Sequence, residues 1–192
     1  MGREFELKFA ASEEQQQAIR NALGDGFQTI AMETTYYDTP DHRLSAVRYT
    51  LRRRMENGVA VCTVKTPADA RGRGEWACRC DRIEDAVPEL CKLGAPEDLR
   101  RWTEPGLVPV CGARFTRLAK TVETNGSVLE LALDTGKLLG GGREEALLEV
   151  EVELKAGTEE AAEAYAAALA GRFGLTPEKK SKFRRALALA EG

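Results

Sequence analysis

Several segments of this chain alternate charged and apolar residues with a period of two, and this pattern constrains the fold more than any other feature. In residues 148–155, Glu149, Glu151, Glu153 and Lys155 alternate with leucine and valine. Residues 48–54 alternate arginine and threonine with Tyr49 and Leu51 in the same way. Successive side chains of a β-strand point to opposite faces. The pattern therefore predicts a sheet with one packed face and one face of ionised groups.

Turn and cap residues divide the chain into strands and helices. Asn57-Gly58 and Asn125-Gly126 are typical of tight hairpins, and Ser12 with Gln15 is typical of a capping box at a helix start. We expect strands at residues 3–9, 28–37, 46–55, 59–66, 73–81, 108–123, 127–135 and 146–155. We expect a helical turn at 39–41 and helices at 12–23, 83–102 (broken near 94–96), 158–173 and 177–190.

The order of these segments predicts an α+β fold with a large antiparallel sheet, because hairpins dominate and helices lie between them. Eight strands are enough to close a β-barrel, which would leave the helices packed outside. The length of 192 residues is that of one ordinary domain. We therefore expect a single domain over residues 1–192.

Composition excludes several classes of protein. The single histidine, His42, argues against zinc sites built from several histidines and against a Ser-His-Asp triad. The net charge of −3 argues against a nucleic-acid-binding protein. No segment has the length and apolar character of a membrane span or a signal peptide, and the five cysteines lack metal-binding spacing. We expect a cytoplasmic protein with reduced thiols and no membrane partner.

The charges of the polar faces are segregated by sign. The first and last strands are rich in acids, whereas the middle strands carry arginine and lysine. One alternative is an ordinary polar face in water. If these faces instead point into a barrel, acids line one wall and bases the other. Arginine and lysine bind phosphate oxygens, and clustered carboxylates hold Mg²⁺ or Mn²⁺. Such an interior predicts a polyphosphate ligand bound with a divalent metal.

The chain carries six short motifs, in the order Glu4-x-Glu6-x-Lys8, Tyr37-Asp38-Thr39-Pro40-Asp41, Leu51-Arg52-x-Arg54, Thr63-x-Lys65, Glu149-x-Glu151-x-Glu153 and Ser181-Lys182. Together they resemble the motifs of one family, the CYTH superfamily of triphosphate tunnel metalloenzymes. Arg73-x-Glu75-Trp76 and Leu131-x-Leu133-Asp134 are most similar to the bacterial inorganic triphosphatases of that family. The motifs keep the family's order and span nearly the whole chain.

The resemblance implies an eight-stranded antiparallel tunnel, a divalent metal cofactor, Mg²⁺ or Mn²⁺, and a set of site residues. The implied metal ligands are Glu4, Glu6, Glu130, Asp134, Glu149, Glu151 and Glu153. The implied substrate-binding residues are Lys8, Arg52, Arg54, Lys65, Arg73, Arg117 and Lys182. The implied catalytic residues are Lys8, Lys65 and Glu75. The alternative for the cations is a salt bridge to a tunnel carboxylate, and for Glu153 a rim charge paired with Lys155. Residues 38–41 are expected to form a structural turn.

The activity implied is metal-dependent hydrolysis of inorganic triphosphate to pyrophosphate and phosphate. The alternatives are a nucleoside or thiamine triphosphatase, a class IV-type adenylate cyclase, and a polyphosphate-binding module without turnover. The expected partner is a small-molecule triphosphate. Some family members carry a helical CHAD domain after the CYTH domain, so a longer parent protein with such a domain stays open, as does the oligomeric state.

Overall fold

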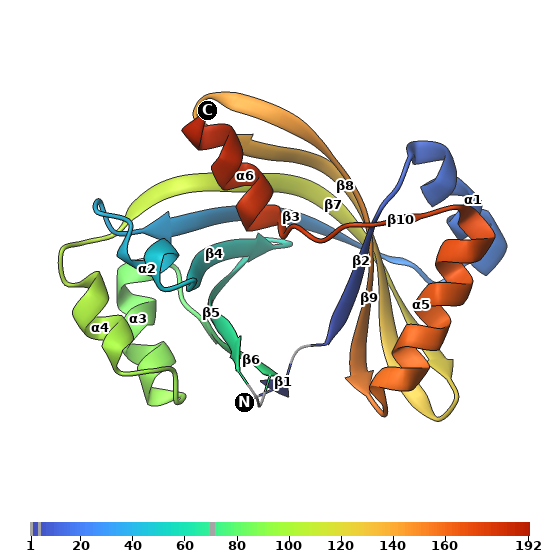
Figure 1. The fold of residues 1–192 in the computed structure, drawn as a ribbon, viewed down its shortest axis with the longest axis horizontal. Coiled ribbons are helices and arrows are strands. Elements are labelled where there is room, and N and C mark those ends of the chain that lie inside the picture. Colours follow the sequence, from blue (N-terminus) through green and yellow to red (C-terminus); the bar gives the residue numbers. More distant parts are fainter. Residues whose placement is uncertain (1, 4, 70–71) are drawn as a thin grey trace.

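The computed structural model describes residues 2–3, 5–69 and 72–192, and its dominant element is one strongly curved antiparallel sheet (Figure 1). The strands are β1 (Gly2–Arg3), β2 (Glu6–Ala10), β3 (Gln28–Asp38), β4 (Thr50–Glu56), β5 (Val59–Asp69), β6 (Gly72–Arg79), β7 (Val108–Thr124), β8 (Ser127–Gly140), β9 (Arg143–Ala156) and β10 (Thr176–Pro177). The helices are α1 (Glu13–Leu23), α2 (Arg43–Ala46), α3 (Ile83–Lys92), α4 (Asp98–Thr103), α5 (Glu159–Phe173) and α6 (Lys182–Glu191). The α+β class with an antiparallel sheet is confirmed.

The sheet differs from the expected eight-stranded closed barrel. Within the described residues it has ten strands, in the order β1-β6-β5-β4-β3-β7-β8-β9-β2-β10, and no ladder joins its two ends. The reason lies in the N-terminal segment, which was expected to be one strand over residues 3–9. It divides into β1, which pairs with β6, and β2, which pairs with β9. The segment therefore bridges the two sides of the curved sheet without closing a continuous ladder.

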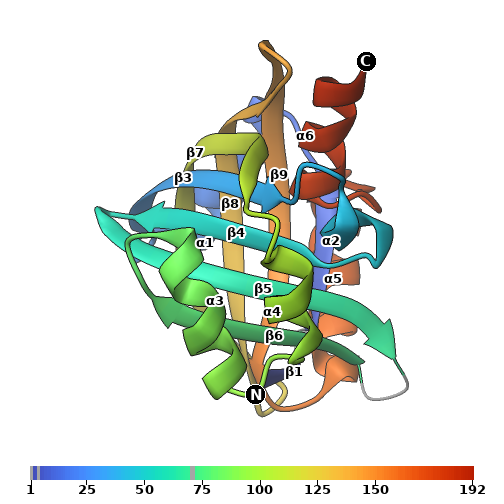
Figure 2. The ribbon, with the colours of Figure 1, turned by 90° about the vertical axis from the view of Figure 1, so that its left-hand side faces the viewer.

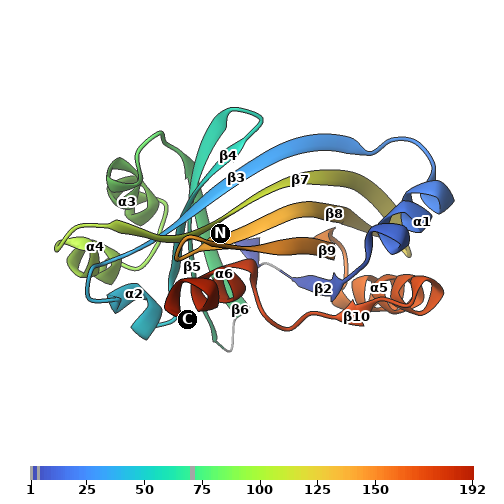
Figure 3. The ribbon, with the colours of Figure 1, turned by 90° about the horizontal axis from the view of Figure 1, so that it is seen from above.

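Helices cover the convex face of the sheet in two groups, as Figures 2 and 3 show. The α3 and α4 helices pack over β4, β5 and β6 through a core that includes Leu51, Val64 and Leu90. The α1 and α5 helices pack over the β2, β8 and β9 strands through Ile19, Leu131 and other apolar side chains. The apolar positions of the alternating segments thus lie outside the curve, beneath helices, and the charged positions lie inside it. None of the described helices has the length and apolar character needed to cross a membrane.

The α6 helix lies on the concave side, where it contacts β7, β8 and β9 (Figure 1). It begins at Lys182, not at residue 177 as expected, because the Ser181 side chain accepts the Arg184 N–H as an N-cap. Pro177 belongs instead to β10, beside Phe9 of β2. The close packing of α6 on the sheet depends on Gly140 at the end of β8.

Two other segments differ from expectation. The strand expected at residues 46–55 begins at Thr50, because residues 43–46 form α2. The buried Asp38 carboxylate accepts the backbone N–H groups of Leu44 and Ser45, and so fixes this turn, in agreement with the structural role expected for it. The strands expected at 127–135 and 146–155 are longer and meet in a hairpin at Gly141-Gly142, both with positive φ.

Gly140→Ala should weaken the docking of α6. A Cβ at this position would lie 2.2 Å from the carbonyl oxygen of Ala186 and 2.8 Å from the backbone nitrogen of Ala190, so the helix must shift. We expect a loss of about 1–3 kcal/mol in the free energy of unfolding, measured by denaturant titration. Gly171→Ala is the control, since a Cβ there meets nothing within 4 Å. Equal unfolding midpoints for Gly140→Ala and the parent would contradict this packing.

Candidate functional site

The concave face holds a cavity of about 330 Å³ lined mainly by charged side chains. Residues from β2 through β9 and from the start of α6 contribute to it. The acidic lining residues are Glu6, Glu56, Glu75, Glu130, Glu151 and Glu153. The basic lining residues are Lys8, Arg52, Arg54, Lys65, Arg117, Lys155 and Lys182. Many of the positions predicted to share the charged face are therefore brought together around one space.

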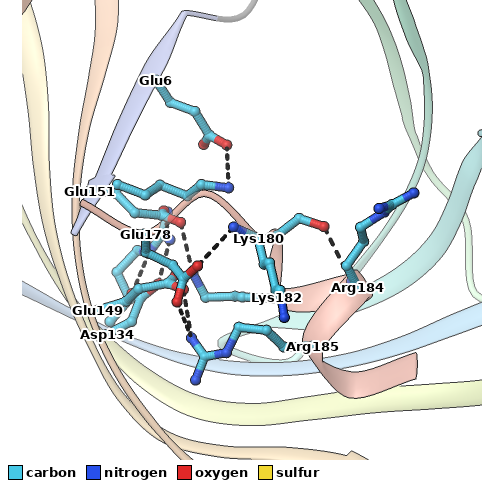
Figure 4. A network of polar contacts seen from close by, with 12 residues as sticks. Glu6, Asp134, Glu149, Glu151, Glu178, Lys180, Lys182, Arg184 and Arg185 are labelled. Carbon is cyan, nitrogen blue, oxygen red and sulfur yellow. Dashed lines mark hydrogen bonds and ion pairs between the residues drawn. The ribbon is translucent and has the colours of Figure 1, made fainter. Parts of the chain in front are cut away.

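A buried acidic cluster forms the floor on the α6 side (Figure 4). Asp134, Glu149 and Glu151 place carboxylate oxygens within 4.8 Å of one another, and the first two side chains are fully buried. The ammonium group of Lys182 lies among them, 2.9 Å from Asp134 Oδ2 and 2.7 Å from Glu151 Oε1, and it also contacts Glu149. Lys182 thus joins α6 to β8 and β9 through three carboxylates.

Two arginines complete the neutralisation of this cluster. Arg117 of β7 donates two hydrogen bonds to Asp134, from Nε at 2.8 Å and from Nη2 at 2.7 Å, and it also contacts Glu151. Arg185, one turn after Lys182 on α6, donates to Glu149 at 3.1 Å. The cluster therefore has three cations for its three carboxylates, as burial of charge requires.

The pKa shifts follow this pairing. Burial disfavours the charged form of Glu151, but Lys182 and Arg117 outweigh that effect and hold the pKa of this carboxyl well below its usual range. Burial is the largest effect at Glu149 and raises the pKa of that carboxyl despite the contact with Lys182. Burial opposes the charge of Lys182 too, yet the three carboxylates raise its pKa above the ordinary lysine value. Lys182 is therefore charged at neutral pH.

A second group of acids lines the open part of the cavity, and the ion pairs of two of them, Glu6 and Glu130, are longer than those of the buried cluster. Glu6, Glu153 and Glu130 lie side by side in register on β2, β9 and β8. Lys155 lies 2.8 Å from Glu153 and 3.8 Å from Glu130, and Lys8 lies 3.6 Å from Glu6. Three like charges on adjacent strands repel one another. These carboxylates are partly exposed and offer oxygen atoms to a cation entering the cavity.

The opposite wall, on β4, β5 and β6, is basic. Glu75 lies between Arg52 and Lys65, at 3.8 Å and 3.3 Å. The buried Nε of Arg52 donates no hydrogen bond within the described residues. Burial, with the neighbouring Arg52 cation, lowers the pKa of Arg54 to about 10, so this guanidinium is still charged at neutral pH. The ion pairs of this wall are longer than those on the floor, and it retains donor capacity for an anion.

The structure divides the residues expected to bind metal. Glu6, Glu130, Glu151 and Glu153 line the cavity, whereas Asp134 and Glu149 lie beneath Lys182 and do not. Glu4 lies outside the described residues, and so does the side chain of Arg73. The expected cations Lys8, Arg52, Arg54, Lys65, Arg117 and Lys182 all line the cavity, as does Glu75.

Sequence reasoning missed Arg185 and the role of Phe115. Arg185 follows Lys182 by three positions, so both lie on one helix face. This spacing is informative only once the helix is known to begin at Lys182, with Ser181 as its N-cap. The Phe115 ring lies under the cations Arg54, Arg117 and Lys182, each within 6 Å of the ring centroid. An aromatic face stabilises cations held close together.

Comparisons with known proteins show which sequences and folds this chain resembles. A model of the CYTH domain matches residues 2–187. An inorganic triphosphatase of Haemophilus influenzae is 31% identical over 134 residues, which are 68% of this chain and 38% of that protein. The chain thus spans well under half the length of this relative.

Two solved structures share the fold. A Pyrococcus horikoshii protein superposes with a TM-score of 0.63 at 24% identity, covering 96% of this chain and 98% of its own. A Hippeastrum protein, described as a putative adenylyl cyclase with a dominant triphosphatase activity, gives a TM-score of 0.69 at 19% identity, covering 98% and 97%. At these identities the likeness extends to the fold alone.

Lys182→Met should destabilise the folded protein, and more so at neutral than at acid pH. The variant keeps the side-chain length but leaves three buried carboxylates with one cation fewer, which costs about 3–5 kcal/mol near neutrality. Burial already raises the pKa of Glu149, and the variant removes the Lys182 charge that opposes this shift. The loss therefore grows as pH rises through about 4 and shrinks when the carboxyls are protonated.

The measurement is denaturant unfolding of parent and variant at several pH values. Lys180→Met, two residues earlier at an exposed position, is the matched control and should unfold like the parent. A loss for Lys182→Met that stays the same across the pH range would show that Lys182 does not neutralise the cluster.

Proposed function

This chain belongs to the CYTH domain family, and from that premise and the charged cavity we propose that it hydrolyses inorganic triphosphate to pyrophosphate and phosphate. The observation that carries the proposal is the opposition of a basic wall and an acidic wall across one cavity. Arg52, Arg54 and Lys65 present cations with long ion pairs, and Glu6, Glu130 and Glu153 present carboxylates across the cavity. An anionic chain would bind the cations of the first wall, and a divalent cation bound to that chain would bind the carboxylates of the second.

The donor set fits Mg²⁺ or Mn²⁺, since hard cations take carboxylate oxygens and the cavity offers no histidine or cysteine among its described lining residues. We assign the metal to Glu6, Glu151 and Glu153, with Glu130 beside them, and Glu4 stays in the proposed set from its motif. A divalent ion held there would neutralise phosphate charge and polarise a phosphoryl group. Asp134 and Glu149 are instead proposed to hold Lys182 and Arg117 in place, because they contact these cations and do not line the cavity. Glu151 contacts the same two cations but lines the cavity, so it can also reach a metal there.

The basic residues would bind and orient the substrate. Arginine donates paired hydrogen bonds to phosphate oxygens, so Arg52 and Arg54, two positions apart on β4, would hold successive phosphates. Lys65 and Arg117 would hold further oxygens from neighbouring strands, as would Arg73 from its motif, and Lys182 would approach from α6. Holding an anhydride chain in one conformation lowers the entropic part of the barrier, and fixed cations stabilise the charge that develops on the leaving oxygen.

No protein nucleophile is required for this reaction. A water molecule attacks the terminal phosphorus, the anhydride P–O bond breaks, and pyrophosphate leaves with the bonding electron pair. Lys8, Lys65 and Glu75 are proposed to orient this water, because they are charged groups that line the same cavity. Glu75 would also offset the mutual repulsion of Arg52 and Lys65 while the substrate is absent.

We further propose that residues 1–192 form a single CYTH domain whose partner is a small-molecule triphosphate, and not nucleic acid. The described cysteines are all unpaired, including the buried Cys62 and Cys111, whose pKa burial raises to about 12. Such unreactive thiols suit a cytoplasmic protein. A CHAD domain in a longer parent protein is compatible with the relative's greater length.

A substrate panel tests the proposed activity. We expect phosphate release from tripolyphosphate in the presence of Mg²⁺ or Mn²⁺, little release from ATP or thiamine triphosphate, and none with excess chelator. Full release in chelator would overturn the metal assignment. Cyclic AMP formed from ATP would identify a cyclase, and tight tripolyphosphate binding without release would identify a binding module.

Arg52→Ala and Arg54→Ala test the basic wall. Each removes charged hydrogen bonds to phosphate, so kcat/KM for tripolyphosphate should fall about 10- to 100-fold. The loss should be larger for tripolyphosphate than for pyrophosphate, because a shorter chain cannot reach every cation.

Arg53→Ala is the internal control. Arg53 lies between the two on β4, but its Nε donates to the Asp81 carbonyl oxygen at 2.7 Å and its side chain does not line the cavity. Its kinetics should match the parent. Equal damage from all three substitutions, at unchanged stability, would mean that the wall has been assigned to the wrong face of β4.

A further inference from the structure

A second hollow of about 620 Å³ adjoins the cavity on the α6 side. The segment from α2 into β4, the end of β5 and the start of α6 form its walls. Lys8, Thr50, Ser181 and Phe183 line both this hollow and the cavity, so the two spaces meet at these side chains. The proposed function assigns nothing to the hollow. A ligand that fills the cavity could extend into it past these four shared residues.

Every charged side chain among the described lining residues of the hollow is cationic. Lys8, Arg48, Lys179 and Arg184 line it, and no carboxylate does among the described lining residues. The neighbouring cavity, in contrast, carries acids and bases in nearly equal number. A concave surface with one sign of charge concentrates ligands of the opposite sign. The composition of the hollow thus favours an anion over a cationic or neutral organic group.

Three of the four cations that line the hollow have no acidic partner among the described residues, the exception being Lys8, which pairs with Glu6. Within the described residues, Arg48, Lys179 and Arg184 form no ion pair, although Lys182 and Arg185 on the same helix as Arg184 are fully engaged with acids. Figure 4 shows Arg184 directed away from the acidic cluster, whereas Lys182 and Arg185 point into it. The α6 helix therefore divides its basic residues between the floor of the cavity and the hollow.

Backbone geometry holds Arg48 at the edge of the hollow. Its φ of 59° lies in the left-handed region, which non-glycine residues seldom adopt. Its N–H donates to the Ser45 carbonyl oxygen at 3.0 Å, and the next N–H, of Tyr49, donates to Leu44 at 2.8 Å. The turn after α2 thus fixes a strained arginine beside the hollow, as is common at ligand sites.

We propose that this hollow is an anion subsite for the phosphates that follow the third in an inorganic polyphosphate chain. The proposal rests on the proposed function, because the first three phosphates would lie in the cavity. Arg48, Lys179 and Arg184 would bind the fourth phosphate, and Lys8 would lie at the junction. The subsite makes the protein prefer inorganic tetraphosphate to triphosphate, and it discriminates against substrates whose terminal group is organic and uncharged or cationic.

Isothermal titration calorimetry with tripolyphosphate and tetrapolyphosphate, each in excess Mg²⁺, tests the subsite. The parent should bind tetrapolyphosphate about 5- to 10-fold more tightly, as expected for two or three new contacts with exposed cations. The double variant Arg48→Asn/Arg184→Ala should bring the ratio of the two Kd values close to unity. Asparagine is chosen at position 48 because it tolerates a positive φ better than alanine does. Lys180→Ala, an exposed lysine beside Lys179 that does not line the hollow, is the control and should keep the parent's ratio.

The results separate this subsite from the proposed hydrolysis. Equal affinities in the parent, or a tetrapolyphosphate preference that survives in the double variant, would overturn the subsite while tripolyphosphate hydrolysis stands. A preference lost in the double variant supports the subsite even if the protein releases no phosphate. Binding of neither chain would overturn both proposals.

Discussion

The contact of one lysine with three buried carboxylates determines much of this structure. Lys182 neutralises Asp134, Glu149 and Glu151 at the point where β8 and β9 would otherwise face a self-repelling group of acids. Because Lys182 is the first residue of α6, the same contact fixes the helix on the concave side of the sheet. The position of the helix in turn places Phe183 at the junction of the cavity and the basic hollow, and Arg184 in the hollow.

Charge compensation separates the parts that maintain the fold from the parts available to a ligand. The inner acids have short contacts with Lys182, Arg117 and Arg185, and two of them are closed to solvent. The ion pairs of the outer Glu6 and Glu130, and those of the basic wall across the cavity, are longer, at 3.3–3.8 Å. A buried charge left without a partner is costly, so the inner group is closely paired. The outer groups are partly exposed, so water can solvate their charges until a charged ligand arrives.

Strand parity made much of this predictable from the sequence. Alternation predicted that Arg52 and Arg54 face the interior of the curved sheet and that Arg53 faces away from it, and the structure agrees. Side chains of a strand alternate strictly between two faces, so burying one face fixes the direction of every side chain. The sequence could not show which acids Lys182 would cover, since that depends on where α6 begins and how it crosses the sheet. The prediction of a closed barrel was also wrong. β1 pairs with β6 and β2 pairs with β9, and this pairing depends on tertiary structure that the local sequence pattern does not show.

The most direct measurement is anomalous diffraction from crystals grown with Mn²⁺ and tripolyphosphate. If the acidic and basic walls bind metal and substrate separately, an Mn²⁺ peak should lie at Glu6, Glu151 and Glu153. Phosphate density should follow Arg52 and Arg54. Lys182 should keep its contacts with Asp134 and Glu149. An Mn²⁺ peak between Asp134 and Glu149 with Lys182 displaced, or phosphates bound away from β4, would contradict it.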